Sequence, residues 1–259
     1  MKAVVTDLDG TLLRNDKSIS KRTFKIISDL EIIGVEFIMA TARAPRSVFQ
    51  LLPFDFTNMY VICYNGAEIY KGNTLLYYKY LDASVVKTII DWIHINCPGT
   101  NISLEMNNRL YTNFDISIMK GWIPPYTQVD FNSFSYKPAA KILVDLTCIN
   151  EINTLKSMLP QNCSMLVTDG GTLGQIAHSD ISKLNGVRSL AKTLGYSLKD
   201  IVAFGDDFND IEMIRECGIG VAMGNAPFEV KRAADIVAAM NDEDGVAIEL
   251  EKMIGLQII

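Results

Sequence analysis

At 259 residues the chain is long enough for one large domain or two unequal ones, and its 49% hydrophobic content excludes a disordered protein. The 24 basic and 30 acidic residues give a net charge of −6, and no basic stripe interrupts the chain, which argues against a nucleic-acid partner. Because no window reaches about 18 uninterrupted apolar residues and the five cysteines are odd in number and widely spaced, we expect no membrane partner and a soluble, cytoplasmic protein with buried free thiols.

A short apolar run at residues 4–6 predicts a buried strand that stops at two carboxylates, Asp7 and Asp9. Gly10 and Thr11 then turn the chain away. Two carboxylates this close repel each other unless a cation lies between them or one of them binds a proton, so the stretch implies a divalent metal. Taken alone, it is equally typical of an ordinary Asp–Gly turn.

Two further strands are also expected to end at polar clusters. The expected elements are a helix capped by Ser18 or Ser20 and ended by Gly34, a strand over 35–40 ending at Thr41-Ala42-Arg43, a short helix opened by Pro45, and a strand over 59–64 ending at Asn65-Gly66-Ala67. Three strand-to-polar-loop junctions separated by helices predict an α/β fold with a doubly wound parallel sheet. Its ligand crevice would lie at the carboxyl edge of the strands.

From residue 68 the pattern changes to short strands and helices without polar strand ends, which predicts that the core sheet is interrupted here. The expected elements are a hairpin over 69–80, helices over 84–96 and about 150–159, and strands over 102–106, 110–112, 141–146 and 165–168. We interpret residues 83–180 as an inserted α+β module. Residues 1–82 and 181–259 would form the core, which resumes with a helix over 183–195, strands over 201–205, 219–223 and 236–237, and a terminal helix from Asp244.

The loop at residues 206–210 carries three carboxylates and an amide directly after a buried strand. Oxygen ligands of this kind suit Mg²⁺, and in a doubly wound sheet this loop can meet Asp7 and Asp9 at the crevice. Thr41 and Lys183 would supply the hydrogen-bond donors and the positive charge opposite these carboxylates. A hydroxyl with adjacent N–H groups and an ammonium at a helix start suit a phosphoryl group.

These four stretches, in this order, resemble the motifs of the haloacid dehalogenase (HAD) superfamily. Asp7-Leu8-Asp9-Gly10-Thr11 matches DxDGT, Thr41 matches the motif II threonine, Lys183 matches the motif III lysine, and Gly205-Asp206-x-x-Asn209-Asp210 matches GDxxND. The long insert between the second and third motifs is similar to that of the Cof-type branch, which has a type C2B cap. The resemblance spans nearly the whole chain.

The resemblance implies a role for each matched residue. Asp7 would be the nucleophile that forms an aspartyl-phosphate, and Asp9 the general acid/base. Mg²⁺ would be held by Asp7, the backbone carbonyl of Asp9 and Asp206, with Asp210 in support. The phosphoryl group would contact Leu8, Thr41, Ala42, Lys183 and Asn209. Where the family has glycine, this chain has Ala42, which would be strained only at a positive φ; we expect an ordinary conformation in which only its N–H is used.

The resemblance therefore implies a Mg²⁺-dependent phosphatase that acts on a small phosphorylated metabolite, a sugar phosphate first among the candidates. A phosphotransferase or phosphomutase on the same scaffold and a non-catalytic phosphate-sensing protein are the alternatives. We expect a monomer or a weak homo-oligomer. Arg43, Glu105 and Arg109 are further candidate substrate contacts without an assigned role.

Overall fold

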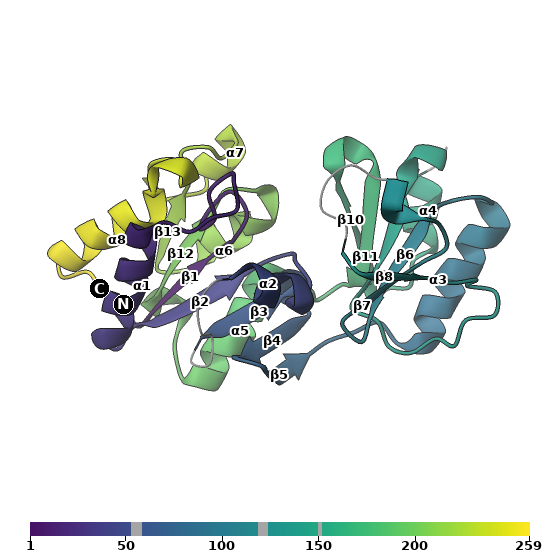
Figure 1. The fold of residues 1–259 in the computed structure, drawn as a ribbon, viewed down its shortest axis with the longest axis horizontal. Helices are drawn as coiled ribbons and strands as arrows, with labels where there is room; N and C mark the ends of the chain where they lie inside the picture. Colours follow the sequence, from purple (N-terminus) through teal and green to yellow (C-terminus); the bar gives the residue numbers. More distant parts are fainter. Residues whose placement is uncertain (53–58, 119–123, 150–151) are drawn as a thin grey trace. The chain divides into compact units, whose positions relative to one another are not determined.

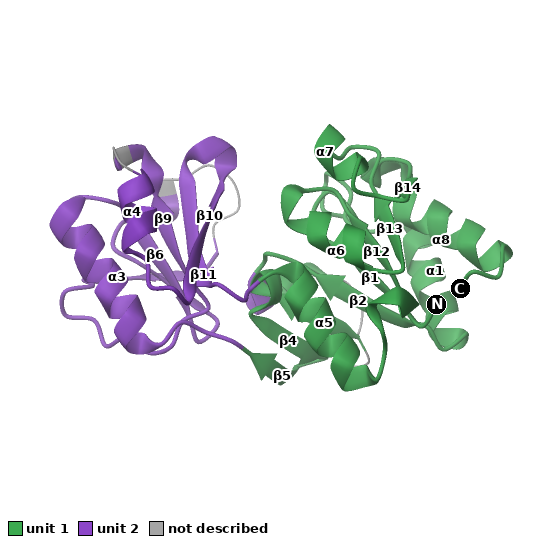
Figure 2. Cartoon of the chain, turned by 180° about the vertical axis from the view of Figure 1, so that it is seen from behind, with its two compact units in different colours: residues 1–43, 48–78, 182–259 green, residues 44–47, 79–181 purple. Residues whose placement is uncertain are grey.

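The computed structural model describes residues 1–52, 59–118, 124–149 and 152–259. The chain forms two compact units (Figure 2): unit 1 comprises residues 1–43, 48–78 and 182–259, and unit 2 comprises residues 44–47 and 79–181. In the part of the chain that the structure describes, every helix is too short or too polar to cross a membrane. The division into a catalytic core and a cap at residues 83–180 stays a prediction.

Unit 1 is built on a sheet whose described strands number eight, in the order β14-β13-β12-β1-β2-β3-β4-β5 (Figure 1). These strands are β1 (Ala3–Thr6), β2 (Glu36–Ala40), β3 (Tyr60–Cys63), β4 (Glu68–Lys71), β5 (Thr74–Tyr78), β12 (Ile201–Gly205), β13 (Ile219–Ala222) and β14 (Ile236–Val237). The strands from β14 to β3 are parallel, whereas β4 and β5 are antiparallel. The expected doubly wound α/β fold is confirmed.

Strand β1 lies where the order of the strands reverses. The chain proceeds from β1 to β2 and β3 on one side, and it returns to build β12, β13 and β14 on the other. The two connections leave β1 in opposite directions, so a crevice opens outside its carboxyl end, where ligands bind in sheets of this kind. This topology brings the polar ends of β1 and β12 together although 195 residues separate Thr11 from Asp206, which share a hydrogen bond.

The helices of unit 1 cover both faces of this sheet. They are α1 (Lys21–Ile32), α5 (Lys183–Leu194), α6 (Ile211–Glu216), α7 (Phe228–Lys231), α8 (Gly245–Gly255) and α2 (Pro45–Leu51), whose first residues belong to unit 2. Helix α1 begins where Ser20 accepts a hydrogen bond from the Thr23 amide, as expected of a capping serine. Helices α5 and α6 bury Val187 and Met213 against Val5 of β1. Helices α1 and α8 pack against each other over the opposite face.

Unit 2 contains a sheet of six described strands in the order β10-β11-β9-β6-β7-β8. Its elements are α3 (Ala83–Asn96), β6 (Ile102–Met106), β7 (Arg109–Thr112), β8 (Tyr126–Gln128), β9 (Lys141–Asp145), α4 (Ile152–Met158), β10 (Cys163–Thr168) and β11 (Leu173–His178). Ile89 of α3 and Leu155 of α4 pack on Leu104 and Ile142 of the sheet, so the two helices cover the same face. The mixed α+β character of this segment agrees with the sequence pattern.

Two features of the fold differ from the sequence analysis. Strands β8 and β11 were not expected: β8 has three residues, and β11 contains Gly174 and Ala177, which have low β-propensity. The hairpin β4–β5 does not interrupt the core sheet but extends it, because β4 turns back antiparallel on β3. The connection at residues 64–67 is too short for a crossover helix, so only an antiparallel neighbour can form there.

Candidate active site

Asp7 lies directly beyond the end of β1. Its amide donates to the Phe204 carbonyl at 3.0 Å, so the backbone at Asp7 is still held by β12, and the chain leaves the sheet after it. The residue is only 5% exposed. Its Oδ1 accepts a hydrogen bond from the Lys183 ammonium at 2.6 Å. A buried carboxylate thus faces the crevice at the topological switch point.

Helix α5 delivers Lys183 to this point. Ser182 caps the helix by accepting from the Asn185 amide. Two glycines allow the helix start to approach β3: a Cβ on Gly66 would lie 2.3 Å from the Ser182 carbonyl oxygen, and a Cβ on Gly186 would lie 2.6 Å from Cγ2 of Ile62. Because both positions lack a side chain, Lys183 reaches the buried carboxylates with only 2% of its surface exposed.

Lys183 bridges two carboxylates, since its Nζ lies 2.6 Å from Asp7 and 2.6 Å from Asp210. Asp210 is fully buried, and its second oxygen accepts hydrogen bonds from the amides of Asp206 and Asp207. Burial alone would lower the pKa of Lys183, but the adjacent Asp210 and Asp7 hold it above its ordinary value. Both oxygens of Asp210 are therefore engaged by protein groups, which fits a residue that shapes the loop.

Asp7, Asp206 and Asp210 form an acidic cluster whose candidate ligand atoms all lie within 4.8 Å of one another. Burial raises the pKa of Asp7 to about 8 although Lys183 opposes it, and Asp210 and Asp206 raise it further. Burial likewise raises the pKa of Asp206 to about 6, against the hydrogen bond from Thr11. Three carboxylates against one ammonium leave excess negative charge. This all-oxygen set fits a hard divalent cation, as the haloacid dehalogenase resemblance implies.

The carboxylate of Asp9 faces two cations. Arg43 donates to both of its oxygens, at 2.5 Å from Nε and 2.7 Å from Nη2, and Lys17 donates to Oδ1 at 2.8 Å. Burial acts in the other direction, but the hydrogen bonds from Arg43 and Lys17 hold the pKa of Asp9 below its ordinary value. Arg43 was a predicted substrate contact without an assigned role. Lys17 was not predicted, because a lone lysine in a polar loop forms no recognisable sequence pattern.

Asn209 pairs with a residue of another loop. Its Nδ2 donates to Asn65 Oδ1 at 3.0 Å, and its own Oδ1 is buried with no hydrogen-bond partner among the described residues. Asn65 has a left-handed backbone, φ 58°, and its amide donates to the Thr41 carbonyl. The loops after β2, β3 and β12 are thereby tied together. The Asn209 Oδ1 can accept a hydrogen bond from a ligand, and only the second N–H of Nδ2 could donate one to a phosphoryl oxygen.

Thr41, Ala42 and Leu8 are the other residues that were predicted to contact the phosphoryl group. Thr41 is buried, and its hydroxyl oxygen accepts from the Arg43 amide at 3.1 Å. Ala42 is not among the described residues with positive φ, so the expected ordinary conformation is confirmed. The Leu8 side chain is fully buried, which leaves its main chain as the only part that can contact a ligand. The buried Glu105 forms a bidentate ion pair with the partly buried Arg46 inside unit 2.

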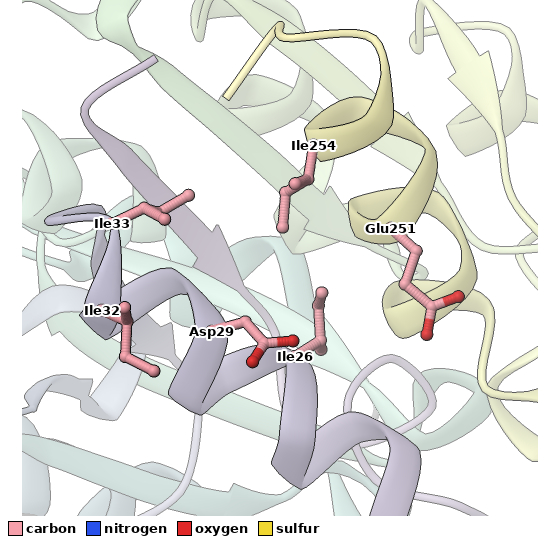
Figure 3. A pocket seen from close by; sticks show the side chains of 6 residues that line it. All are labelled: Ile26, Asp29, Ile32, Ile33, Glu251 and Ile254. Atoms are coloured by element: carbon pink, nitrogen blue, oxygen red, sulfur yellow. The ribbon is translucent and has the colours of Figure 1, made fainter.

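The structure also contains an apolar pocket of about 330 Å³ in unit 1 (Figure 3). Its walls come from α1, the residue after it and α8, and its lining residues are Ile26, Asp29, Ile32, Ile33, Glu251 and Ile254. The two carboxylates there pair with Lys25 and Arg22. None of the predicted site residues lines this pocket, and its isoleucines offer nothing to a phosphoryl group.

Known proteins resemble this chain over nearly its whole length. The family model described as haloacid dehalogenase-like hydrolase matches residues 4–250. A Haemophilus influenzae protein named provisionally as a phosphatase is 30% identical, with 97% of each chain covered. The 5-amino-6-(5-phospho-D-ribitylamino)uracil phosphatase YcsE of Bacillus subtilis is 28% identical and covers 95% of this chain and 93% of its own.

Solved structures share the fold. The crystal structure of TM0651 from Thermotoga maritima superposes with a TM-score of 0.84 at 27% identity, with 97% of each chain covered. The HAD subclass IIB sugar phosphatase BT4131 superposes with a TM-score of 0.79 over 100% of both chains, and at 24% identity it supports the fold alone. These similarities run through the sequences of both units.

Proposed function

Since the chain belongs to the haloacid dehalogenase-like hydrolase family, we propose that it is a Mg²⁺-dependent phosphatase that hydrolyses the phosphate monoester of a small metabolite through an aspartyl-phosphate. The observation that carries the proposal is the buried Asp7 at the end of β1, which lies 2.6 Å from Lys183 and within the acidic cluster. Family membership and the relatives named as phosphatases support this class of enzyme.

Asp7 is the nucleophile in this proposal. Its free oxygen attacks phosphorus, the bond between phosphorus and the ester oxygen breaks, and the phosphoryl group is transferred to the carboxylate. The ammonium of Lys183 stabilises the negative charge of the phosphoryl group in the bound substrate and in the transition state. Asp7 and Asp210, on either side, hold the ammonium in place. When bound, Mg²⁺ would be held by Asp7, the Asp9 carbonyl and Asp206, with Asp210 in support, and it would neutralise phosphate charge.

Asp9 moves the protons. It must carry a proton when the substrate is bound, although Arg43 and Lys17 favour its ionised form. It donates that proton to the departing alkoxide and later accepts one from the water that hydrolyses the aspartyl-phosphate. Arg43 and Lys17 hold its carboxylate by three hydrogen bonds, which fixes the orientation of a side chain that would otherwise turn freely. Thr41, Ala42, Leu8 and Asn209 would contact the phosphoryl oxygens.

Sugar phosphates and phosphorylated sugar alcohols are the proposed substrate class. The Bacillus subtilis relative is named for a phosphoribityl compound, whose phosphate lies on a polyhydroxylated carbon chain. We carry this feature of its named substrate to the present chain.

A turnover screen tests the proposal. The full chain with Mg²⁺ is incubated with sugar phosphates, sugar-alcohol phosphates and nucleotides, and released inorganic phosphate is measured with and without a second hydroxyl compound as acceptor. We expect catalytic turnover of at least one polyol phosphate, abolished by excess EDTA and by Asp7→Asn. Transfer to the added acceptor in place of water would identify a phosphotransferase, and binding without turnover on the whole panel would indicate a phosphate-sensing protein.

A further inference from the structure

The carboxylate of Asp206 is enclosed by three groups from two other segments. The Thr11 hydroxyl donates to its Oδ1 at 2.7 Å, and Nδ2 of Asn225 lies 3.4 Å from its Oδ2. On a third side lies Gly10, where a Cβ would come within 2.2 Å of the same Oδ2. Each oxygen therefore has a donor that orients it, and the missing side chain of Gly10 leaves the space that the carboxylate occupies.

Asn225 is itself fixed on both ends of its amide. Its Nδ2 also donates to the Gly10 carbonyl at 2.8 Å, and its Oδ1 accepts from the Asn241 amide at 3.1 Å. The side chain of Asn241 is buried and donates to the Leu13 carbonyl at 2.9 Å. Two amide side chains from the last third of the chain thus secure the loop after β1 and the orientation of Asp206 together.

We propose that Asn225 is a positioning residue for the divalent cation, acting with Thr11 to orient the Asp206 carboxylate. In this respect the inference rests on the proposed function, because Asp206 must be a ligand. The physical reason is repulsion: the carboxylates of Asp7, Asp206 and Asp210 offer ligand atoms within 4.8 Å of one another, and an unrestrained Asp206 carboxylate would turn away from the other two toward solvent. A carboxylate that is already oriented loses less freedom when the cation binds, and partners of metal ligands typically contribute about 10–100-fold in affinity.

The test is a direct measurement of Mg²⁺ affinity by isothermal titration calorimetry on the full chain without substrate. Asn225→Ala should raise the Kd about tenfold. Thr11→Val, which keeps the shape but removes the donor, should do the same, whereas Thr11→Ser keeps the hydroxyl and should remain within about threefold of the unaltered chain. The matched control is Thr100→Val: this buried hydroxyl in unit 2 donates to the Cys97 carbonyl, and its loss should leave the Kd unchanged.

Asp206→Asn separates the two proposals. If it leaves the Kd unchanged, the metal assignment of the proposed function is wrong. If it abolishes binding while Asn225→Ala and Thr11→Val leave the Kd unchanged, the present inference alone is overturned. Thermal unfolding in EDTA identifies variants that fail to fold. Should Asn225→Ala do so, the Thr11→Val and Thr11→Ser pair decides, since equal Kd values for these two would overturn the inference and a tenfold difference would support it.

Discussion

Asp7 and Asp9 are two positions apart in the sequence, yet their surroundings are opposite. Asp7 is buried, and burial raises its pKa to about 8 against the adjacent Lys183. Asp9 is partly exposed, and the hydrogen bonds from Arg43 and Lys17 hold its pKa below the ordinary value although burial opposes them. The two carboxylates thus differ in burial and in partners, and the proposed function gives them different tasks.

Replacing each carboxylate separately tests this division. With Asp7→Asn, no phosphoenzyme should form from any substrate, because the nucleophile is gone. With Asp9→Asn, phosphorylation by p-nitrophenyl phosphate should lose less than phosphorylation by an alkyl phosphate, since p-nitrophenolate hardly needs a proton. The phosphoenzyme should then accumulate, because the attacking water has lost its base. Single-turnover labelling measures both. Equal losses for the two leaving groups, with no trapped intermediate, would contradict the role of Asp9.

Gly10 and Gly34 provide a matched comparison at the same scale. Their φ angles are +79° and +76°, so alanine at either position should cost about 1 kcal/mol of unfolding free energy. A Cβ at Gly34 meets no atom within 4 Å, whereas at Gly10 it would lie 2.2 Å from the Asp206 carboxylate.

We therefore expect Gly10→Ala and Gly34→Ala to lower stability by similar amounts, because the Asp206 side chain can turn away from the new methyl group. Only Gly10→Ala should weaken Mg²⁺ binding, by about tenfold or more. Chemical denaturation and calorimetry check the two quantities separately. Equal Mg²⁺ affinities in the two variants would show that the position of the Asp206 carboxylate does not limit binding.

At the scale of elements, helix starts and buried strands could be predicted from sequence because their signals are local. Ser20 caps α1 as expected, and β6, β12 and β14 have the predicted bounds. Strands β8 and β11 could not be predicted from the sequence, because their β-propensity is weak. Pairing with strands that are distant in sequence stabilises them. The same limit applies to Asn225 and Lys17, whose partners are set by the fold.

Helix α5 offers a prediction in which two effects have opposite signs. Gly186→Ala in a helix should stabilise it by about 1 kcal/mol through helix propensity. The new Cβ, however, would lie 2.6 Å from Ile62 and 3.0 Å from the Cα of Gly66, and the backbone contact cannot easily yield. We expect the steric effect to dominate, with a net loss of about 1–3 kcal/mol and a lower kcat/KM as Lys183 is displaced.

The control is Gly255→Ala in α8, where a Cβ meets nothing within 4 Å. That change should be neutral or stabilising and leave kcat/KM unaltered. Denaturant unfolding and steady-state kinetics on both variants give the comparison. A stabilised Gly186→Ala enzyme with full activity would mean that the close approach of α5 to β3 is not needed to place Lys183.

For the whole molecule, the site joins segments that no local pattern connects. Thr11, Lys183, Asp206 and Asn225 come from both ends of the chain, and all of them lie in unit 1 although unit 2 separates their segments in sequence. Ordered motifs could indicate that these ends meet. The hydrogen bonds of Thr11 and Asn225 to Asp206, in contrast, can be found only from the packing of the loops.

Because the proposed ligands all belong to unit 1, Mg²⁺ should stabilise that unit selectively. At a Mg²⁺ concentration of 100 times the Kd, binding stabilises the folded state by about 2.7 kcal/mol, equivalent to roughly 100-fold slower exchange of amides that open only by unfolding. Hydrogen exchange followed by mass spectrometry should show this protection in β1, β12 and the start of α5, and no change in β6 and β9. Asp206→Asn should remove the effect. Equal protection of β6 and β9 would mean that the two units unfold as one, and protection confined to them would place the cation in unit 2.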